Sequence, residues 1–489
     1  MGEIQKQSIK GTIYTYIGIS IGFLTSGLLF PRFFTTEQIG LVNVIVSYAV
    51  ITAQFALLGT NGLITRFFPF FRNNEKKHNG FLTIGIAIIT FGFFFSSSVL
   101  MLLNNFNLLS TTKSPLLNSF FPSVYILIFF IVFFNFFDNY AKVLYNAVIG
   151  TFLKEFVQRL FILFAIILFI LNIVKFDMFY ALYIFAYSLP FFIITFYLYK
   201  KKLLFFPKPT IPENVSTKEM FLMSVFSIFS GLAGVLTINI DRIMVQNYIG
   251  LDNAGIYTIM FFFGSMVAIP SRSLIKISST YIADAWKQQD LKTIGTIYQK
   301  SIVNQVIIGS FILLIMWSNI DNIFAIIGDK YSTGKYVILF IGLSYLTDML
   351  IGTANIIIAT SKEYKKITYI IILQGILVII TNIVFIKLFG IVGAAIGSLA
   401  SKSIANTLKV LVIKAKFGLM PYNKKILIIF ISMTIAYLPA LFLSNNNLFI
   451  NILLKTLPSA LIFIALINSF KLSEELNLKN FKNILNSLK

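Results

Sequence analysis

The sequence predicts an all-α polytopic membrane protein with about fourteen transmembrane helices. Of its 489 residues, 57% are apolar and only 12% are charged, and the mean hydropathy is +0.86. A soluble globule cannot enclose so much apolar surface. Apolar stretches of about 20 residues, each able to cross about 30 Å of hydrocarbon as a helix, recur along the whole chain. Nearly all of the chain is therefore expected to lie in a membrane.

The first six spans form the expected N-lobe, residues 1–199. The first span follows Lys6 and Lys10 but is too long for the apolar region of a signal peptide, and no small-residue cleavage site follows it. We therefore expect it to remain as an uncleaved helix. The six spans are residues 11–31, 39–60, 81–103, 120–148, 156–173 and 178–199.

A polar interruption without a span follows. Residues 200–218 hold three consecutive lysines together with Pro207, Pro209 and Pro212, which is typical of an extended linker. We predict a cytoplasmic linker here, followed by a C-lobe, residues 219–416. Its six spans are residues 219–241, 254–274, 301–318, 335–360, 367–386 and 390–412.

An internal repeat supports this division into two lobes. Residues 33–41 match residues 248–256 at a constant offset of 215, and residues 146–151 match residues 355–360 at an offset of 209. Each lobe has an even number of spans, so both lobes share one orientation. The resulting expectation is a pseudo-two-fold axis along the membrane normal, with a substrate site between the lobes.

Two further spans, residues 426–443 and 448–468, lie outside the repeat in a C-terminal region of residues 417–489. The tail beyond them alternates apolar side chains with lysines from Leu478 to Lys489. This pattern predicts an amphipathic helix on the inner leaflet.

The distribution of the forty Lys and Arg side chains orients the chain. Cations crowd the segments that lie inside if Met1 is cytoplasmic, whereas the opposite segments hold few. We therefore expect both termini in the cytoplasm and the spans in a bacterial plasma (inner) membrane. Orientation also explains the net charge of +22, so no nucleic-acid partner is expected. The outer cations are Arg32, Lys113, Lys175, Arg242, Lys330, Lys335 and Lys387.

The composition also excludes several function classes. The chain has no cysteine, which excludes disulfides, iron–sulfur clusters and thiolate chemistry. Its single histidine, His78, argues against a histidine-based metal site or a Ser-His-Asp triad. We expect no catalytic residue and no metal or other cofactor. A membrane polysaccharide polymerase or acyltransferase remains the alternative from the enzyme class, but it commonly presents a sizeable loop with catalytic residues.

Several short segments carry a resemblance to a known family. The segments are Glu37 with Gly40-Leu41, Arg66 to Arg72 at the end of span two, Asp241-Arg242, residues 254–257 and residues 390–395. Through them the chain resembles, over most of its first 416 residues, the polysaccharide exporter branch of the multidrug/oligosaccharidyl-lipid/polysaccharide flippase superfamily, which includes O-antigen flippases.

The resemblance implies a flippase that moves an undecaprenyl-pyrophosphate-linked oligosaccharide across the membrane by alternating access, for polysaccharide or lipopolysaccharide O-antigen biosynthesis. The implied partners are this substrate, membrane lipids and the glycan polymerase or glycosyltransferases of the same pathway. The chain has two predicted helices in addition to the twelve of the two lobes, and in this respect it is similar also to lipid II flippases. A drug/cation antiporter of the same superfamily is a further alternative. The coupling ion would be H⁺ or Na⁺.

A pyrophosphate needs cations in the cavity, and arginine binds phosphate oxygens through two parallel hydrogen bonds. Resemblance and position favour Arg66 and Arg272, with Arg72 as a further candidate; anchoring on the inner side explains all three as well. Arg242 lies on the outer side, where cations are scarce, although a local pair with Asp241 would also account for it. Polar side chains that could contact sugars, or equally join helices, are Asn43, Gln54 and Asn239.

Charged residues within spans are costly and usually face a cavity. Asp348 and Lys402 lie at matched depth near the middle of spans ten and twelve, so we expect them to pair between helices as a switch or as a permanent salt bridge. Asp138 occupies nearly the same place in the first lobe. Lys142 stands four residues further on the same helix face, where the two side chains neutralise each other.

Overall fold

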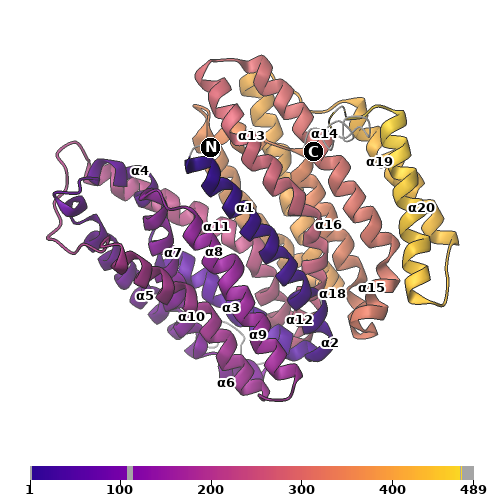
Figure 1. The fold of residues 1–489 in the computed structure, drawn as a ribbon, viewed down its shortest axis with the longest axis horizontal. Helices are drawn as coiled ribbons and strands as arrows, with labels where there is room; N and C mark the ends of the chain where they lie inside the picture. The colour runs from indigo at the N-terminus through magenta and orange to yellow at the C-terminus, as the bar shows by residue number, and fades with distance from the viewer. Residues whose placement is uncertain (1–2, 107–113, 474, 476–489) are drawn as a thin grey trace. The chain divides into compact units, whose positions relative to one another are not determined.

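The computed structural model describes residues 3–106, 114–473 and 475 (Figure 1). Over these residues all regular secondary structure is helical. The chain forms two compact units, residues 1–258 and residues 259–489. The expected all-α membrane fold is therefore confirmed, and each unit is described by itself below.

The first unit is built from apolar helices joined by short turns. Large side chains such as Phe91 and Phe94 remain exposed on α5, as a lipid-facing surface requires. Its helices are α1 (Glu3–Gly22), η1 (Phe23–Leu29), α2 (Phe30–Phe33), α3 (Thr36–Ala56), α4 (Thr60–Phe71), η2 (Lys77–Gly80), α5 (Phe81–Asn105), α6 (Pro115–Phe120), α7 (Ser123–Val143), α8 (Val148–Phe152), η4 (Leu153–Val157), α9 (Gln158–Ile170), α10 (Phe176–Lys200), α11 (Thr217–Ile249) and α12 (Leu251–Ser265), whose end enters the second unit.

The two copies of the first repeat pack against each other where α3 and α12 begin. A methyl group on Gly40 would lie 2.1 Å from the Leu251 carbonyl oxygen, and one on Gly255 would lie 1.9 Å from that of Thr36. The offset of 215 relates the two contacts to each other, because Gly40 corresponds to Gly255 and Thr36 corresponds to Leu251. The Thr36 hydroxyl also donates to Asp252 Oδ1 at 2.7 Å. Only glycine allows the two backbones to approach so closely, which explains why the repeat keeps it at this position.

The predicted linker lacks helix from Leu203 to Ser216, as expected, but part of it is docked. The Tyr140 hydroxyl donates to the Leu203 carbonyl at 3.2 Å, and the Thr83 hydroxyl donates to the Pro207 carbonyl at 3.1 Å. The Thr210 amide donates to the Asn79 carbonyl at 3.0 Å. The proline-rich stretch is thus fixed on α5, α7 and the turn before α5.

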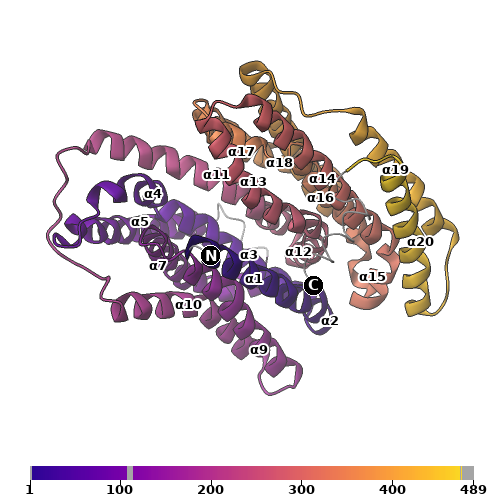
Figure 2. The same ribbon diagram turned by 45° about the horizontal axis from the view of Figure 1, so that its top comes forward.

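The second unit is centred on α14, most of whose apolar stretch is buried. The last two helices lie side by side in both views and also pack on α14 (Figures 1 and 2). Its helices are η5 (Met266–Ala268), α13 (Ile269–Lys287), α14 (Leu291–Ser318), α15 (Ile320–Ile327), η6 (Asp329–Gly334), α16 (Lys335–Leu350), α17 (Ala354–Ala359), α18 (Tyr364–Phe417), α19 (Lys424–Phe442) and α20 (Leu448–Ser469).

Each of the fourteen predicted spans falls mainly on helix, although turns interrupt some of them, such as residues 57–59 and 351–353. Within the described residues, 11 helices are long and apolar enough to cross a membrane. One of them, α18, contains two predicted spans, because Gly390, with φ 58° and ψ −136°, breaks it. The spans predicted at 156–173 and 335–360 fall on α9 and on α16 with α17, which are shorter helices.

The compact units divide after Thr258, beyond the predicted linker, because α11 packs along α3 and α4. The lobe boundaries deduced from the repeat stay a prediction. The predicted amphipathic tail, residues 478–489, lies outside the described residues.

Candidate functional site

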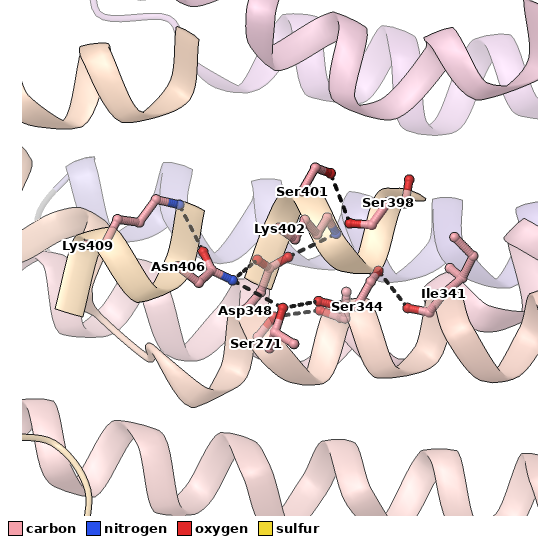
Figure 3. Close-up of polar contacts among 11 residues, drawn as sticks. Ser271, Ile341, Ser344, Asp348, Ser398, Ser401, Lys402, Asn406 and Lys409 are labelled. Carbon is pink, nitrogen blue, oxygen red and sulfur yellow. Dashed lines mark hydrogen bonds and ion pairs between the residues drawn. The ribbon is translucent and has the colours of Figure 1, made fainter. Parts of the chain in front are cut away.

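The second unit contains an ion pair between two apolar helices (Figure 3). Asp348 lies in the last turn of α16, and Lys402 lies in the part of α18 that follows Gly390. The Lys402 ammonium is 3.1 Å from Asp348 Oδ2 and 3.6 Å from the centroid of the Tyr345 ring. The pairing expected from matched depth is therefore present. A cation above an aromatic face gains further electrostatic attraction.

Asn406 completes the coordination of this carboxylate. Its amide nitrogen donates to Asp348 Oδ1 at 2.9 Å and to the Thr347 hydroxyl at 3.2 Å, and its Oδ1 accepts from the Lys409 ammonium at 3.1 Å. Lys402, Asn406 and Lys409 stand at i, i+4 and i+7, so they share one face of α18. We call Asp348, Lys402, Asn406 and Lys409 the α16–α18 network.

Exposure within the α16–α18 network is uneven. The Lys402 side chain is 11% exposed and Lys409 is 5% exposed, whereas the Asp348 side chain is 41% exposed. One enclosed ammonium group thus contacts the accessible carboxylate directly, and the second is linked to it through Asn406. Lys409 was grouped in sequence with the inner-side cations. Its position on the same helix face as Lys402 is the signal that could have identified it.

The corresponding position in the first unit holds the second predicted pair. Lys142 Nζ lies 2.6 Å from Asp138 Oδ2, within α7. Here the carboxylate is the enclosed partner, at 14% exposure, and the ammonium is 43% exposed. Asp138 packs closely against the backbone of α8, because a methyl group on Gly150 would lie 1.7 Å from Asp138 Oδ1.

A second charged pair, which sequence analysis missed, lies close to it. Arg159 in α9 is 2.7 Å from the Glu155 carboxylate in η4 and donates to the Gly18 carbonyl of α1 at 2.6 Å. A methyl group on Gly22 would meet the same guanidinium at 2.3 Å. The i, i+4 spacing of opposite charges at the border of a span is the available sequence signal.

Arg242 and Asn239, both sequence candidates, contact each other on α11. The guanidinium donates to Asn239 Oδ1 at 3.3 Å and to the Ile238 carbonyl at 3.2 Å. The neighbouring Asp241 is fully buried and accepts a 2.5 Å hydrogen bond from the Tyr257 hydroxyl. The Arg242 guanidinium thus bonds to an amide and a carbonyl of its own helix, and Asp241 is bonded to Tyr257.

The other candidates in the first unit have separate surroundings. Arg66 is exposed on α4, with Nη1 3.8 Å from the Met223 sulfur. Arg72 donates to the Val143 carbonyl at 2.5 Å and stacks on Tyr145, so it ties the end of α4 to the end of α7.

Asn43 donates to the Ile39 carbonyl at 2.9 Å, which uses its amide within its own helix. Gln54 abuts α11, where a methyl group on Gly231 would lie 2.2 Å from its amide nitrogen. The side chain of Arg272 lies outside the described part of the chain, although its backbone belongs to α13. Among the described residues no group of three His, Cys, Asp or Glu could hold a metal ion.

Comparison with known proteins identifies the family. A family model described as polysaccharide biosynthesis protein matches residues 8–282, which is more than half of the chain. No curated protein sequence matches the chain.

Three solved structures share the fold. The chain is similar to the lipid II flippase MurJ in an inward closed conformation, with 15% identity and a TM-score of 0.71, over 94% of this chain and 98% of that one. An inward-facing multidrug resistance MATE family transporter of the MOP superfamily is 13% identical, with a TM-score of 0.61 over 83% and 94%. A MOP superfamily transporter from Pyrococcus furiosus is 13% identical, with a TM-score of 0.55 over 85% and 96%.

These are folds of transporters, and the helices described above reproduce their multi-pass membrane architecture. The chain therefore belongs to the polysaccharide biosynthesis protein family, and it shares its fold with these transporters.

Proposed function

We propose that the protein moves an undecaprenyl-pyrophosphate-linked oligosaccharide from the inner to the outer leaflet of a bacterial plasma membrane, for polysaccharide or O-antigen biosynthesis. The family supports a flippase of this general kind. The observation that carries the substrate class is the pair of enclosed ammonium groups, Lys402 and Lys409, on an apolar helix. Cations at membrane depth are costly and usually serve a substrate or a switch, and a pyrophosphate is an anion.

In this proposal the phosphates are bound by Arg66, Arg242 and Arg272, and the sugars by Asn43, Gln54 and Asn239. Arg242 offers a guanidinium that is already oriented by Asn239, at 3.3 Å. Glycosyltransferases would supply the substrate and a glycan polymerase would use it.

The α16–α18 network is the proposed switch. Its carboxylate is the accessible partner, so a proton, or Na⁺ in place of the ammonium, can reach Asp348 while Lys402 stays enclosed. Either event weakens the attraction between the helices and leaves more positive charge near Lys402 and Lys409. The coupling ion and the anionic substrate would then both act on the α16–α18 network. The Asp138–Lys142 pair is the corresponding candidate in the first unit.

A lipid II-type flippase is the second candidate, because the fold shared with MurJ extends over 94% of this chain and so includes helices beyond twelve. A drug/cation antiporter has less support, since enclosed cations repel a cationic substrate. A membrane polymerase or acyltransferase has no support from the family or the fold.

Proteoliposomes test the proposal. The protein is reconstituted with a fluorescent lipid pyrophosphate that carries either an oligosaccharide or the lipid II head group, and an impermeant quencher measures transfer between leaflets. We expect transfer of the oligosaccharide lipid and no efflux of a small organic cation. The Arg66→Ala/Arg242→Ala variant should lose most of this transfer and the Arg→Lys variants part of it, since lysine keeps the charge but not the planar fork. Full transfer by the double alanine variant would contradict these roles.

Cysteine labelling tests the proposed orientation, because the chain has no native cysteine. Lys76 and Lys208 are exposed on the segments expected inside, and Asn446 is exposed on a segment expected outside. His78 is unsuitable, since it is 2% exposed and a cysteine there would be shielded on either side. An impermeant reagent added to intact cells should label only position 446. Labelling at position 208 would contradict the orientation.

A further inference from the structure

A polar cavity of about 140 Å³ lies in the second unit, away from the α16–α18 network. It is bounded by the first half of α14, by the start of α19 and by the segment that follows α20. The side chains that determine its chemistry are those of Lys300, Asn304, Lys425, Ser473 and Glu475. A space of this size holds several water molecules or one phosphate group.

The base of the cavity is polar and well enclosed. Asn304 and Ser473 are 8% and 9% exposed, and the Ser473 hydroxyl donates to Asn304 Oδ1 at 2.7 Å. The Asn304 amide nitrogen donates to the Glu475 carboxylate. Because Asn304 is oriented by Ser473, its N–H groups point toward the position that Glu475 occupies. A buried amide oriented in this way is suited to an anion.

Two lysines flank the same position. Lys300 Nζ is 3.6 Å from Glu475 Oε1, and Lys425 Nζ donates to the Leu472 carbonyl at 3.2 Å. One ammonium group therefore contacts the carboxylate, and a second lines the same cavity. The Lys300 and Glu475 side chains are 52% and 55% exposed, and a pair so accessible to solvent stabilises a protein little. Glu475 can therefore be replaced by a stronger anion.

The position of the cavity along its helices identifies that anion. Lys300 directly precedes the predicted span at 301–318, Lys425 lies at the start of α19, and Leu472 follows the end of α20. The cavity is thus level with the boundary between the apolar helices and their polar ends, where lipid head groups lie. The most abundant anion at that level is the phosphate of the phospholipids.

We infer that this cavity binds the phosphate of an anionic phospholipid head group and that Glu475 occupies the phosphate position when no lipid is bound. Lys300 and Lys425 supply the charge, and Asn304 supplies hydrogen bonds to the phosphate oxygens. The site is independent of the transported substrate, so failure of this inference leaves the proposed flippase function unaffected.

Binding to the full-length protein in detergent tests the inference, with short-chain phosphatidylglycerol as the probe and phosphatidylcholine of the same chain length as the comparison. The Lys300→Gln/Lys425→Gln variant should bind phosphatidylglycerol at least about tenfold more weakly, because two charge-assisted contacts are lost. Glu475→Gln should bind it more tightly, because the competing carboxylate is gone. This gain cannot arise from misfolding.

Lys424→Gln is the matched control. It removes the same charge from the adjacent residue, which does not line the cavity, and its affinity should stay within about twofold of the native value. Equal losses for Lys424→Gln and Lys425→Gln, or equal affinity for phosphatidylcholine, would overturn the inference. Inorganic phosphate and glycerol phosphate form a separate arm. If either binds as tightly as phosphatidylglycerol with the same dependence on Lys425, the site is for a soluble phosphate and the lipid assignment is wrong.

Discussion

The two membrane-embedded ion pairs use the same chemistry with opposite burial. In the first unit the enclosed partner is the acid, Asp138 at 14% exposure, and the base is 43% exposed. In the second unit the enclosed partner is the base, Lys402 at 11%, and the acid is 41% exposed. Removing the enclosed partner leaves an exposed charge and should cost little stability. Removing the exposed partner leaves an enclosed charge and should cost more. Similar ion pairs in the two units therefore need not have similar electrostatics.

The largest effect is expected from Asp348→Asn. The substitution preserves volume but leaves the ammonium groups of Lys402 and Lys409 enclosed without this carboxylate, which costs about 3–5 kcal/mol if desolvation is complete. Lys402→Gln should cost clearly less, since the group it leaves is the accessible acid. Thermal unfolding of the purified variants measures both losses.

A double-mutant cycle sharpens this result. The Asp348→Asn/Lys402→Gln variant should be more stable than the sum of the single losses predicts, and Lys409→Gln should partly rescue Asp348→Asn by removing the second ammonium group. Additive losses would show that the pair contributes no coupling. Asp348 would then be treated as a lone protonatable group that faces a cavity.

A smaller loss is expected from Gly150→Ala in the first unit. The new methyl group would lie 1.7 Å from Asp138 Oδ1, so the acid must turn away from Lys142 or α8 must shift. Overpacking of this kind costs about 1–3 kcal/mol. The midpoint of thermal unfolding should fall accordingly.

The matched control for that substitution is Gly234→Ala in α11. Nothing lies within 4 Å of a methyl group at Gly234, so alanine should leave stability unchanged or raise it slightly through its higher helix propensity. Equal losses at the two glycines would mean that the contact with Asp138 is unimportant.

A still smaller loss is expected from Lys142→Gln. It leaves the enclosed carboxylate of Asp138 without its near partner, but Lys154 remains within electrostatic reach of that acid. We expect the free energy of unfolding to fall by about 1 kcal/mol, which is at the low end of the cost of an unsatisfied buried acceptor. Asp138→Asn should lose less stability than Lys142→Gln. In the second unit the acid-to-amide substitution is expected to lose more, so the order is reversed. Unfolding of the two variants at equal pH measures this order. The same order in both units would contradict the comparison.

The sequence alone was sufficient for the fold class, because long apolar stretches can be read locally and a bilayer requires helices of about 20 residues. It also identified the Asp348–Lys402 pair, because a charge in the middle of an apolar segment has few other charged partners at the same depth. The repeated glycines Gly40 and Gly255 were likewise visible in the internal repeat, although their mutual contact was not.

Tertiary structure decided which side of each helix faces a partner. Lys409 was counted with the inner cations, yet the rotation of α18 turns it toward Asn406. Arg159 reaches a carbonyl of α1 far away in sequence, and Glu475 meets Asn304 across the start of α14. Hydropathy and spacing report only depth along a helix. The rotation of that helix, and hence the burial of each charge, depends on the packing of the neighbouring helices, which no local pattern contains.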